Sequence, residues 1–387
     1  MALNAPALRL IDFHSVLGTK SHPSDSGTMA HKTHVSIPHW SWIAPAAGAL
    51  VVVLAFTGMV AGGSSIVSAV AALLLGAAVF ASVHHAEVLA IRVGEPFGSI
   101  ILAVAVTVIE VGLIVSIMLS DASGTAVVAR DTVFSAIMIV LNGVIGVCLV
   151  LGAGRHHEQT FRLDSASAAL AVLGTLAILT LVLPNYVDPG GQREFTRVQL
   201  VVIDIVCLAL YLVFVFVQTV RHRDYFLEFA DAADADDPPP SDAVTLASAV
   251  LLPLSLTAVI LLSKLLSYPL EKAVQAAGMP QAVVGVVIAA VVLLPEGIAS
   301  VRAALTNRLQ SSVNLVLGSA LASIGLTIPV VADLAVLMDR ELTLGLSNKN
   351  IVLLLLTLFV STLTLGTAAP PCFKARCISP SSRCSYC

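Results

Sequence analysis

Long apolar stretches alternate with short polar connections along almost the whole chain after residue 42. Each stretch holds about 20 residues with few charges, and a helix of that length crosses a hydrocarbon core about 30 Å thick. We therefore predict ten membrane-spanning helices. They run near residues 43–60, 64–83, 97–119, 132–153, 166–184, 198–220, 243–267, 280–303, 311–337 and 349–367.

The composition favours a polytopic all-α membrane protein. The chain is 57% hydrophobic and 11% charged, whereas a soluble domain carries about 25% charged residues. Lys and Arg are scattered between apolar stretches, so no nucleic-acid-binding surface is expected. The expected surroundings are a lipid bilayer, and no prosthetic cofactor is indicated. The sequence leaves the oligomeric state open.

The positive charges predict how the chain is oriented in the membrane. With the N-terminus in the cytoplasm, the inside segments hold ten of the Lys and Arg residues and the outside loops hold six. Cytoplasmic loops carry the excess of such residues. We expect a multi-pass protein of the inner (plasma) membrane, with residues 1–42 forming a polar N-terminal segment on the cytoplasmic side. No cleavable signal is evident, and Met29 is an alternative start.

An acidic linker over residues 221–242 divides the chain into two halves, 43–220 and 243–367. Its core, EFADAADADDPPPSD (228–242), combines six acidic residues with three consecutive prolines and cannot bury apolar surface. We expect a solvated cytoplasmic linker. The alternative is a weak Ca²⁺-sensing segment, although it lacks the Gly and the terminal Glu of a Ca²⁺-binding loop.

Two glutamates lie inside predicted spans, Glu110 in 97–119 and Glu296 in 280–303. A carboxylate at the centre of a membrane-spanning helix costs about 2.5 kcal/mol or more unless it faces protein, water or a cation. Glu110 and Glu296 are therefore the first candidates for a functional site.

The two glutamate-bearing spans and the spans that follow them form similar segments, 97–153 and 280–337. In each segment the second helix is rich in Gly, Ser and Asn, which allow close packing and offer oxygen ligands. By the span count, Glu110's helix runs outward and Glu296's runs inward. This pattern predicts inverted repeats with an ion site at the midplane between them. Pro295 removes a backbone donor beside Glu296 and predicts a kink there.

Five blocks of sequence resemble a known family: RVGEPFGS, TVIEVGLI, RDTVFSAIMIVLNG, LLPEGIAS and NLVLGSALASIGLTIP. They resemble the ChaA-type branch of the cation/Ca²⁺ exchanger superfamily, the bacterial Ca²⁺(Na⁺)/H⁺ antiporters. The resemblance implies two inverted repeats of about five helices each, preceded by one extra N-terminal helix. It also implies that Glu110 and Glu296 bind the cation (the transported metal ion) or the proton. Polar neighbours transfer less firmly: Asn142, Ser319 and Asn314.

The end of the chain departs from this family. The resemblance implies an eleventh span, but residues 368–387 read AAPPCFKARCISPSSRCSYC, a polar, Cys-rich tail that could not cross a membrane. We expect the final helix to be missing here, as after a frameshift or a truncated reading frame.

The chemistry of a carboxylate pair predicts exchange. Ca²⁺ takes six to eight oxygen ligands, and two carboxylates would neutralise it. Without a metal ion the pair would repel each other and take up protons. We expect a secondary antiporter exchanging Ca²⁺, and Na⁺ or K⁺ as further substrates, for H⁺ by alternating access. The alternative is a mainly monovalent Na⁺(K⁺)/H⁺ antiporter.

Two other function classes are disfavoured. An intramembrane metalloprotease needs two histidines four residues apart with a Glu between them on a helix, which HHAEV does not provide. A cation channel needs a filter loop or a ring of charges, and the inverted repeat argues against it. No enzyme activity is expected.

Weaker candidates surround the third span. Glu95, His84 and His85 could line an access path for the ions, but we expect the histidines to form a solvated, interfacial pair. Asp204 and Asp333 lie near the ends of predicted spans, where we expect both to reach water.

Overall fold

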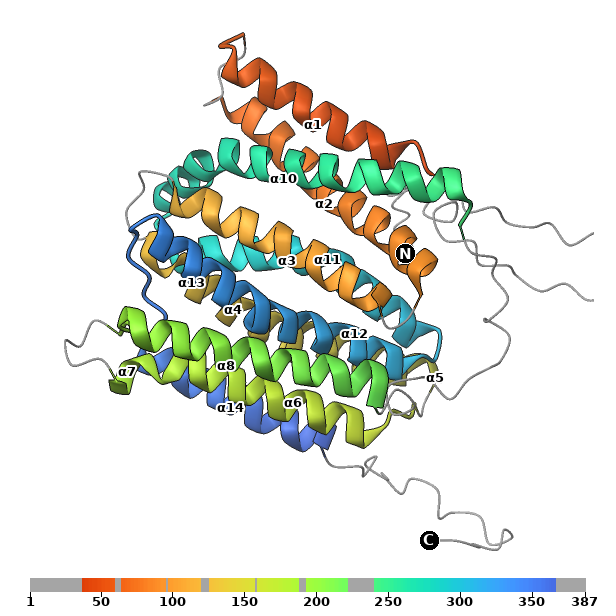
Figure 1. The fold of residues 1–387 in the computed structure, drawn as a ribbon, viewed down its shortest axis with the longest axis vertical. Helices are drawn as coiled ribbons and strands as arrows, with labels where there is room; N and C mark the ends of the chain where they lie inside the picture. The colour runs from red at the N-terminus through yellow and green to blue at the C-terminus, as the bar shows by residue number, and fades with distance from the viewer. Residues whose placement is uncertain are drawn as a thin grey trace, which may run out of the picture. The chain divides into compact units, whose positions relative to one another are not determined.

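The computed structural model describes residues 37–59, 64–94, 97–119, 125–156, 159–187, 193–221 and 240–366. These residues form helices and no strand (Figure 1). Among them, nine helical segments are long and apolar enough to cross a membrane, and α1 (Trp40–Phe56) is a shorter apolar helix. The predicted all-α polytopic fold is confirmed. Residues 1–36, Glu95, residues 222–239 of the linker and the tail 368–387 lie outside the described residues.

The second predicted span ends later than its hydropathy indicated. The sequence predicted its end at residue 83, but α2 (Ser65–Val93) continues for almost three more turns. The predicted end was wrong because the helix carries His84 and His85 into protein contacts rather than into water. The seventh span is longer too, since α10 (Asp242–Ala276) continues well beyond residue 267.

The helices form two compact units, and each unit takes segments from both halves of the chain. The first unit holds α1, α2, α3 (Phe97–Met118) and α10. The second holds most of α11 (Ala282–Leu305), which passes from one unit to the other at residues 284 and 285, and all the remaining helices. The units therefore do not coincide with the sequence halves on either side of the linker.

In the first unit α10 packs along α2, and α1 and α3 each pack against both (Figure 1). A Cβ atom on Gly112 of α3 would lie 2.6 Å from Ile260 Cγ1 of α10, so only a glycine allows this approach. The end of α2 meets the start of α10, because His85 contacts Ser248. The helices α2 and α10 are therefore antiparallel.

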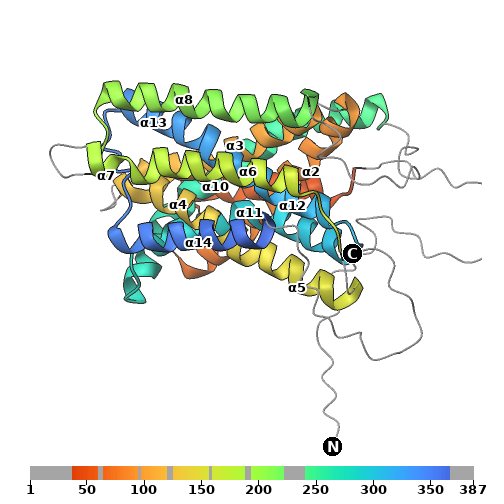
Figure 2. The same ribbon diagram turned by 90° about the horizontal axis from the view of Figure 1, so that it is seen from below.

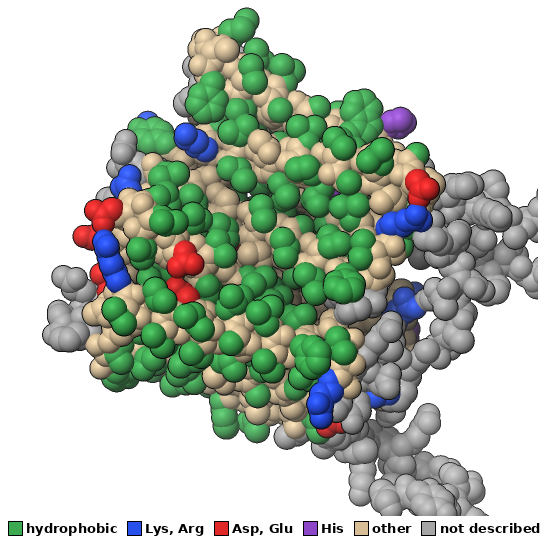
Figure 3. All heavy atoms as spheres, in the orientation of Figure 1, with side chains coloured by type: hydrophobic (Ala, Val, Ile, Leu, Met, Phe, Trp, Pro, Cys, Tyr) green, Lys and Arg blue, Asp and Glu red, His purple; other side chains and the backbone are tan. Residues whose placement is uncertain are grey.

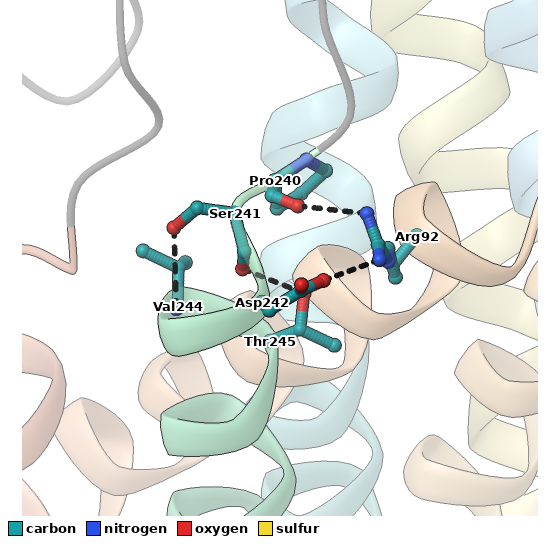
Figure 4. A network of polar contacts seen from close by, with 6 residues as sticks. All are labelled: Arg92, Pro240, Ser241, Asp242, Val244 and Thr245. Carbon is teal, nitrogen blue, oxygen red and sulfur yellow. Dashed lines mark hydrogen bonds and ion pairs between the residues drawn. The ribbon is translucent and has the colours of Figure 1, made fainter.

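The last residues of the acidic linker are held against the end of α2 (Figure 4). Arg92 donates one hydrogen bond to the Pro240 carbonyl, at 3.3 Å, and pairs with the Asp242 carboxylate. Ser241 caps α10 by accepting from the Val244 N–H. The start of the seventh span is thus fixed to the first half of the chain.

In the second unit, several spans are interrupted by π-helical turns, and α6 lies between α8 and α14 (Figure 2). Its α-helices are α4 (Val128–Met138), α5 (Ile145–His156), α6 (Leu163–Ala177), α7 (Pro184–Val187), α8 (Arg197–Phe216), α12 (Leu309–Ala322), α13 (Ile328–Leu337) and α14 (Asn348–Gly366). The π-helical turns are η3 (Ile139–Val144), η4 (Ile178–Val182), η5 (Val217–Arg221) and η6 (Ser323–Thr327).

Polar contacts at one end of the second unit join connections that the topology predicted to be inside. Gln159 Nε2 donates to the Ala304 carbonyl at 2.7 Å, linking the segments after α5 and α11. Gln310 Nε2 donates to Ser165 Oγ at 2.8 Å, linking the starts of α12 and α6. These four span ends therefore share one end of the unit.

The connections that were predicted to be outside meet in the same way. Arg197 at the start of α8 pairs with Asp339 after α13, at 3.0 Å. Thr343 donates to Glu194 at 2.7 Å, beside these groups. The contacts within the unit agree with the predicted alternation of span directions.

Large apolar side chains cover the exposed faces of the helices. Figure 3 shows one face on which hydrophobic side chains dominate and most charged ones lie toward the two sides. On the apolar helix α8, for example, the side chains of Val201, Val202 and Ile205 are exposed. Such a surface is stable in lipid and would be unstable in water.

Candidate cation-binding site

Glu110 is buried near the middle of α3, with 2% of its surface exposed. Polar contacts hold this part of α3 against α10. Ser263 Oγ of α10 donates to Ser116 Oγ at 2.8 Å, and Ser116 donates to the Gly112 carbonyl at 2.6 Å. The carboxylate is thus carried by a helix whose position is fixed just after it by a close glycine contact and a serine pair.

Glu296 is buried near the middle of α11, with 5% of its surface exposed. The adjacent Gly297 faces Val144, and a Cβ atom there would be 3.6 Å from Val144 Cγ2. Nearer the start of α11, a Cβ atom on Gly285 would lie 2.8 Å from the backbone of Asp131. The helix α11 therefore runs beside α4 and η3 in the same direction and brings Glu296 to the level of η3.

Corresponding helices of the two similar segments both contain a π-helical turn. The spans Val128–His156 and Leu309–Leu337 have 29 residues each, and they contain η3 and η6. A π-helical turn leaves carbonyl groups misaligned with the regular helical bonds and often occurs at functional sites. Neither π-helical turn was predicted from the sequence.

Ser319 Oγ on α12 and Ser300 Oγ on α11 are among the buried hydroxyl oxygens that have no hydrogen-bond partner in the described residues. Ser300 is fully buried one turn after Glu296, on the same face of the helix. Pro295 also has no N–H to donate to the Val291 carbonyl one turn earlier. Ser300 was missed from the sequence, although its spacing of four from Glu296 could have identified it.

The two predicted asparagines are held by other side chains. Asn142 in η3 donates from Nδ2 to Thr357 Oγ1 of α14 at 3.0 Å. This hydrogen bond does not use the Oδ1 atom of Asn142. Asn314 Oδ1 accepts from Gln310 Nε2 at 3.0 Å, within the polar network that joins α12 to α6. Asn314 is therefore part of this network near the start of its span, and its role as a ligand stays a prediction.

The structure places the candidate residues in different units. Glu110 belongs to the first unit, and Glu296, Asn142, Asn314 and Ser319 belong to the second. The pairing of the two glutamates stays a prediction. The described residues contain no group of three or more His, Cys, Asp or Glu side chains that could hold a metal ion. A cation bound by Glu110 and Glu296 would need hydroxyl, amide and carbonyl oxygens as well.

The prediction that His84 and His85 form a solvated pair was wrong. His85 is fully buried, with Nδ1 3.3 Å from Ser248 Oγ and Nε2 3.2 Å from the Ser41 carbonyl. The His84 ring packs beside Trp40, with ring centroids 5.6 Å apart. The expectation failed because α1 and α10 cover this end of α2. Glu95 lies outside the described residues.

The sequence matches the sodium/calcium exchanger protein family over residues 46–220 and 247–374. The chain belongs to this family. The assignment confirms the resemblance to the cation/Ca²⁺ exchanger superfamily that its glutamate-bearing blocks indicated.

Two curated relatives cover most of the chain, and both are named as transporters. The chain is 61% identical over 331 residues to y4hA of Sinorhizobium fredii, named provisionally as an ionic transporter, covering 86% of this chain and 90% of that one. It is 36% identical over 293 residues to the sodium-potassium/proton antiporter ChaA of Escherichia coli, covering 74% and 79%.

Solved structures share the fold at low identity. The native structure of YfkE has a TM-score of 0.64 at 17% identity, covering 84% of this chain and 92% of that one. The H⁺/Ca²⁺ exchanger CAX has a TM-score of 0.61 at 15% identity, covering 84% and 81%. These likenesses extend over most of the chain and concern the fold.

Proposed function

We propose that this chain is a secondary antiporter that exchanges Ca²⁺ for protons at a site built on Glu110 and Glu296. The observation that carries the proposal is the burial of both carboxylates near the middle of membrane-spanning helices. A buried carboxylate is costly when charged, and the binding of a metal ion or of protons would compensate its charge. Competition between the two kinds of ligand for the same oxygens couples their movements.

Antiparallel packing of corresponding helices supports an inverted repeat. Apart from α1, the first helix of one half is α2 and the first helix of the other is α10. These two helices are antiparallel within the first unit. In the second unit α6 and α14 are antiparallel, because Gly174 faces Leu358 whereas Gly366 faces Ser167. Inverted repeats allow one site to open alternately to either side as one part of the protein moves against another. We assign alternating access to this chain on that basis.

Charge and ligand number favour Ca²⁺ as the cation. Two carboxylates balance a divalent ion, and Ca²⁺ accepts additional oxygens in flexible geometry. Within the second unit, the Ser300 and Ser319 hydroxyls have no other partner among the described side chains. The Asn142 Oδ1 atom is a further candidate ligand, since the hydrogen bond to Thr357 uses only Nδ2.

A second candidate is a mainly monovalent antiporter that exchanges Na⁺ or K⁺ for protons. It is favoured by the 36% identity to ChaA, which is named as a sodium-potassium/proton antiporter. For either cation we place the protein in the inner membrane, with its N-terminus and the acidic linker on the cytoplasmic side.

Proton release from everted vesicles tests both candidates. Vesicles that contain the protein are acidified inside, and a pH-sensitive dye reports the release of protons when Ca²⁺, Na⁺ or K⁺ is added. We expect Ca²⁺ to give the largest response at the lowest concentration. We expect Glu110→Gln and Glu296→Gln each to abolish it, because a neutral amide can neither balance the cation nor take up a proton.

Glu194→Gln is the matched control. It also removes one carboxylate, but its amide oxygen can still accept the hydrogen bond from Thr343, so exchange should continue. Normal exchange by either intramembrane variant would refute the carboxylate-pair mechanism. A response to Na⁺ and K⁺ without one to Ca²⁺ would select the monovalent candidate.

A further inference from the structure

Asp204 is a buried carboxylate that the glutamate site does not use. It lies on α8 about two turns from the helix start, with 6% of its surface exposed. Both carboxylate oxygens are buried and accept no hydrogen bond from the described residues. The expectation that Asp204 reaches water was wrong, because α13 and η6 pack over this part of α8.

The groups around Asp204 supply no compensating positive charge. The helix packs against α13, η6, α6 and η4. Asp333 of α13 interacts electrostatically with Asp204 as a like charge. The turns η6 and η4 contain no ionisable residue, and Asp164, on α6, is at the opposite end of its span.

The remaining ionisable groups are on α8 itself. Cys207 and Tyr211 are buried on its next two turns. Arg197, at the start of α8, is paired with Asp339 instead. Among the ion pairs of the described residues, none includes Asp204.

We infer that Asp204 binds a proton at neutral pH and is a second proton-binding site separate from the glutamates. A carboxylate that is buried and not hydrogen-bonded is stable in lipid only when its charge is neutralised. A metal ion would require several oxygen ligands, and the described residues offer no cluster of three acidic, His or Cys side chains here. A proton requires no such ligands.

The position of Asp204 suggests where this proton comes from. Asp333 of α13 is exposed, whereas Asp204 is buried. Both lie toward the end of the second unit where Arg197 meets Asp339. The topology places that end on the outer side, so the proton on Asp204 would come from the outer solution. This direction rests on the proposed function, whereas the binding of the proton does not.

Infrared spectroscopy of the purified protein tests the inference without any transport assay. The measurement uses the Glu110→Gln/Glu296→Gln protein, so that the two glutamates contribute no carboxylic-acid signal. At pH 7 we expect a carbonyl band of protonated carboxylic acid that loses intensity in Asp204→Asn. Glu194→Gln, which removes a carboxyl group hydrogen-bonded to Thr343, should leave that band unchanged.

A second measurement uses the unmodified chain and does not depend on how a variant folds. Hydrophobic carbodiimides react with protonated carboxyl groups in apolar surroundings, so peptide mass spectrometry should find an adduct on Asp204 at pH 7. Its yield should fall at alkaline pH. A band that Asp204→Asn leaves intact, or an absence of adduct at Asp204, would show that this carboxylate is ionised and overturn the inference. Loss of Ca²⁺ exchange alone would bear on the glutamate site and not on Asp204.

Discussion

Asn142 in η3 donates a hydrogen bond to Thr357 of α14, two residues that are 215 positions apart in the chain. The bond fixes the amide group of a candidate ligand. Interhelical hydrogen bonds in membrane proteins contribute about 0.6 kcal/mol on average. We expect Asn142→Ala and Thr357→Val each to lower stability by about that amount, and the double variant to lose little more. Thermal unfolding in detergent gives the coupling energy of this double-mutant cycle.

The same pair separates packing from binding. Asn142→Ala should also raise the KM for the transported cation, because it removes the Oδ1 oxygen. Thr357→Val should affect KM less, since the amide remains. Equal KM values in the parent and Asn142→Ala would remove Asn142 from the ligand set.

The contact of Gly112 with Ile260 predicts a size limit beside Glu110. Gly112→Ala would place a Cβ atom 2.6 Å from Ile260 Cγ1, and overpacking of this kind costs about 1–3 kcal/mol. We expect a lower unfolding temperature and slower exchange. In the double variant Gly112→Ala/Ile260→Ala, the shorter side chain at position 260 leaves room for the new Cβ atom. Gly112→Ala should therefore lower stability less in this background than it does alone.

Gly76→Ala is the control for helix propensity, because a Cβ atom there has no neighbour within 4 Å. This substitution should be neutral or slightly stabilising. If Gly112→Ala changed the unfolding temperature and the exchange rate no more than Gly76→Ala does, α3 and α10 would not be in close contact at Gly112.

The buried Ser300 hydroxyl predicts an effect on affinity. If Ser300 Oγ contacts the cation bound at Glu296, Ser300→Ala removes one neutral ligand at a cost of about 1 kcal/mol. The KM for the cation should rise about fivefold, while the unfolding temperature changes little. Thr306→Val is a suitable comparison, since Thr306 is exposed on the following connection and bonds only to backbone carbonyls of its own helix end. An unchanged KM in Ser300→Ala would exclude the hydroxyl as a ligand.

Accessibility of introduced cysteines tests the orientation. In a variant lacking the native cysteines, Asp234→Cys in the acidic linker should react with a membrane-impermeant thiol reagent only in everted vesicles. Tyr186→Cys on α7, where the side chain is 76% exposed, should react only in right-side-out cells. The reverse result for the pair would invert the predicted topology.

Much of the fold could be predicted from the sequence because lipid imposes a simple length rule. Apolar stretches near Glu110 and Glu296 must span the membrane as helices, since backbone groups have no other partners in hydrocarbon. The burial of both glutamates could be predicted because a carboxylate that faces lipid is costly. Their spacing within similar segments was visible without a structure.

Other features depend on contacts between distant residues and could not be predicted. The π-helical turns η3 and η6 have no composition that distinguishes them from regular helix. Asn142 and Thr357 meet only after folding, as do His85 and Ser41. Asp204 looked like a residue near a span end, because the sequence does not show that α13 packs over it.

The division of each compact unit between the two halves of the chain has a consequence for biosynthesis. When α2 and α3 enter the membrane, α10 has not yet been translated. At that stage Glu110 on α3 is in the bilayer without α10, which packs against α3 in the folded protein. Helices that insert first and associate later are a normal route for membrane proteins. A ribosome that stopped within the acidic linker would therefore release a fragment in which neither unit is complete. If the two sequence halves were made as separate fragments in one membrane, together they would contain the residues of both compact units.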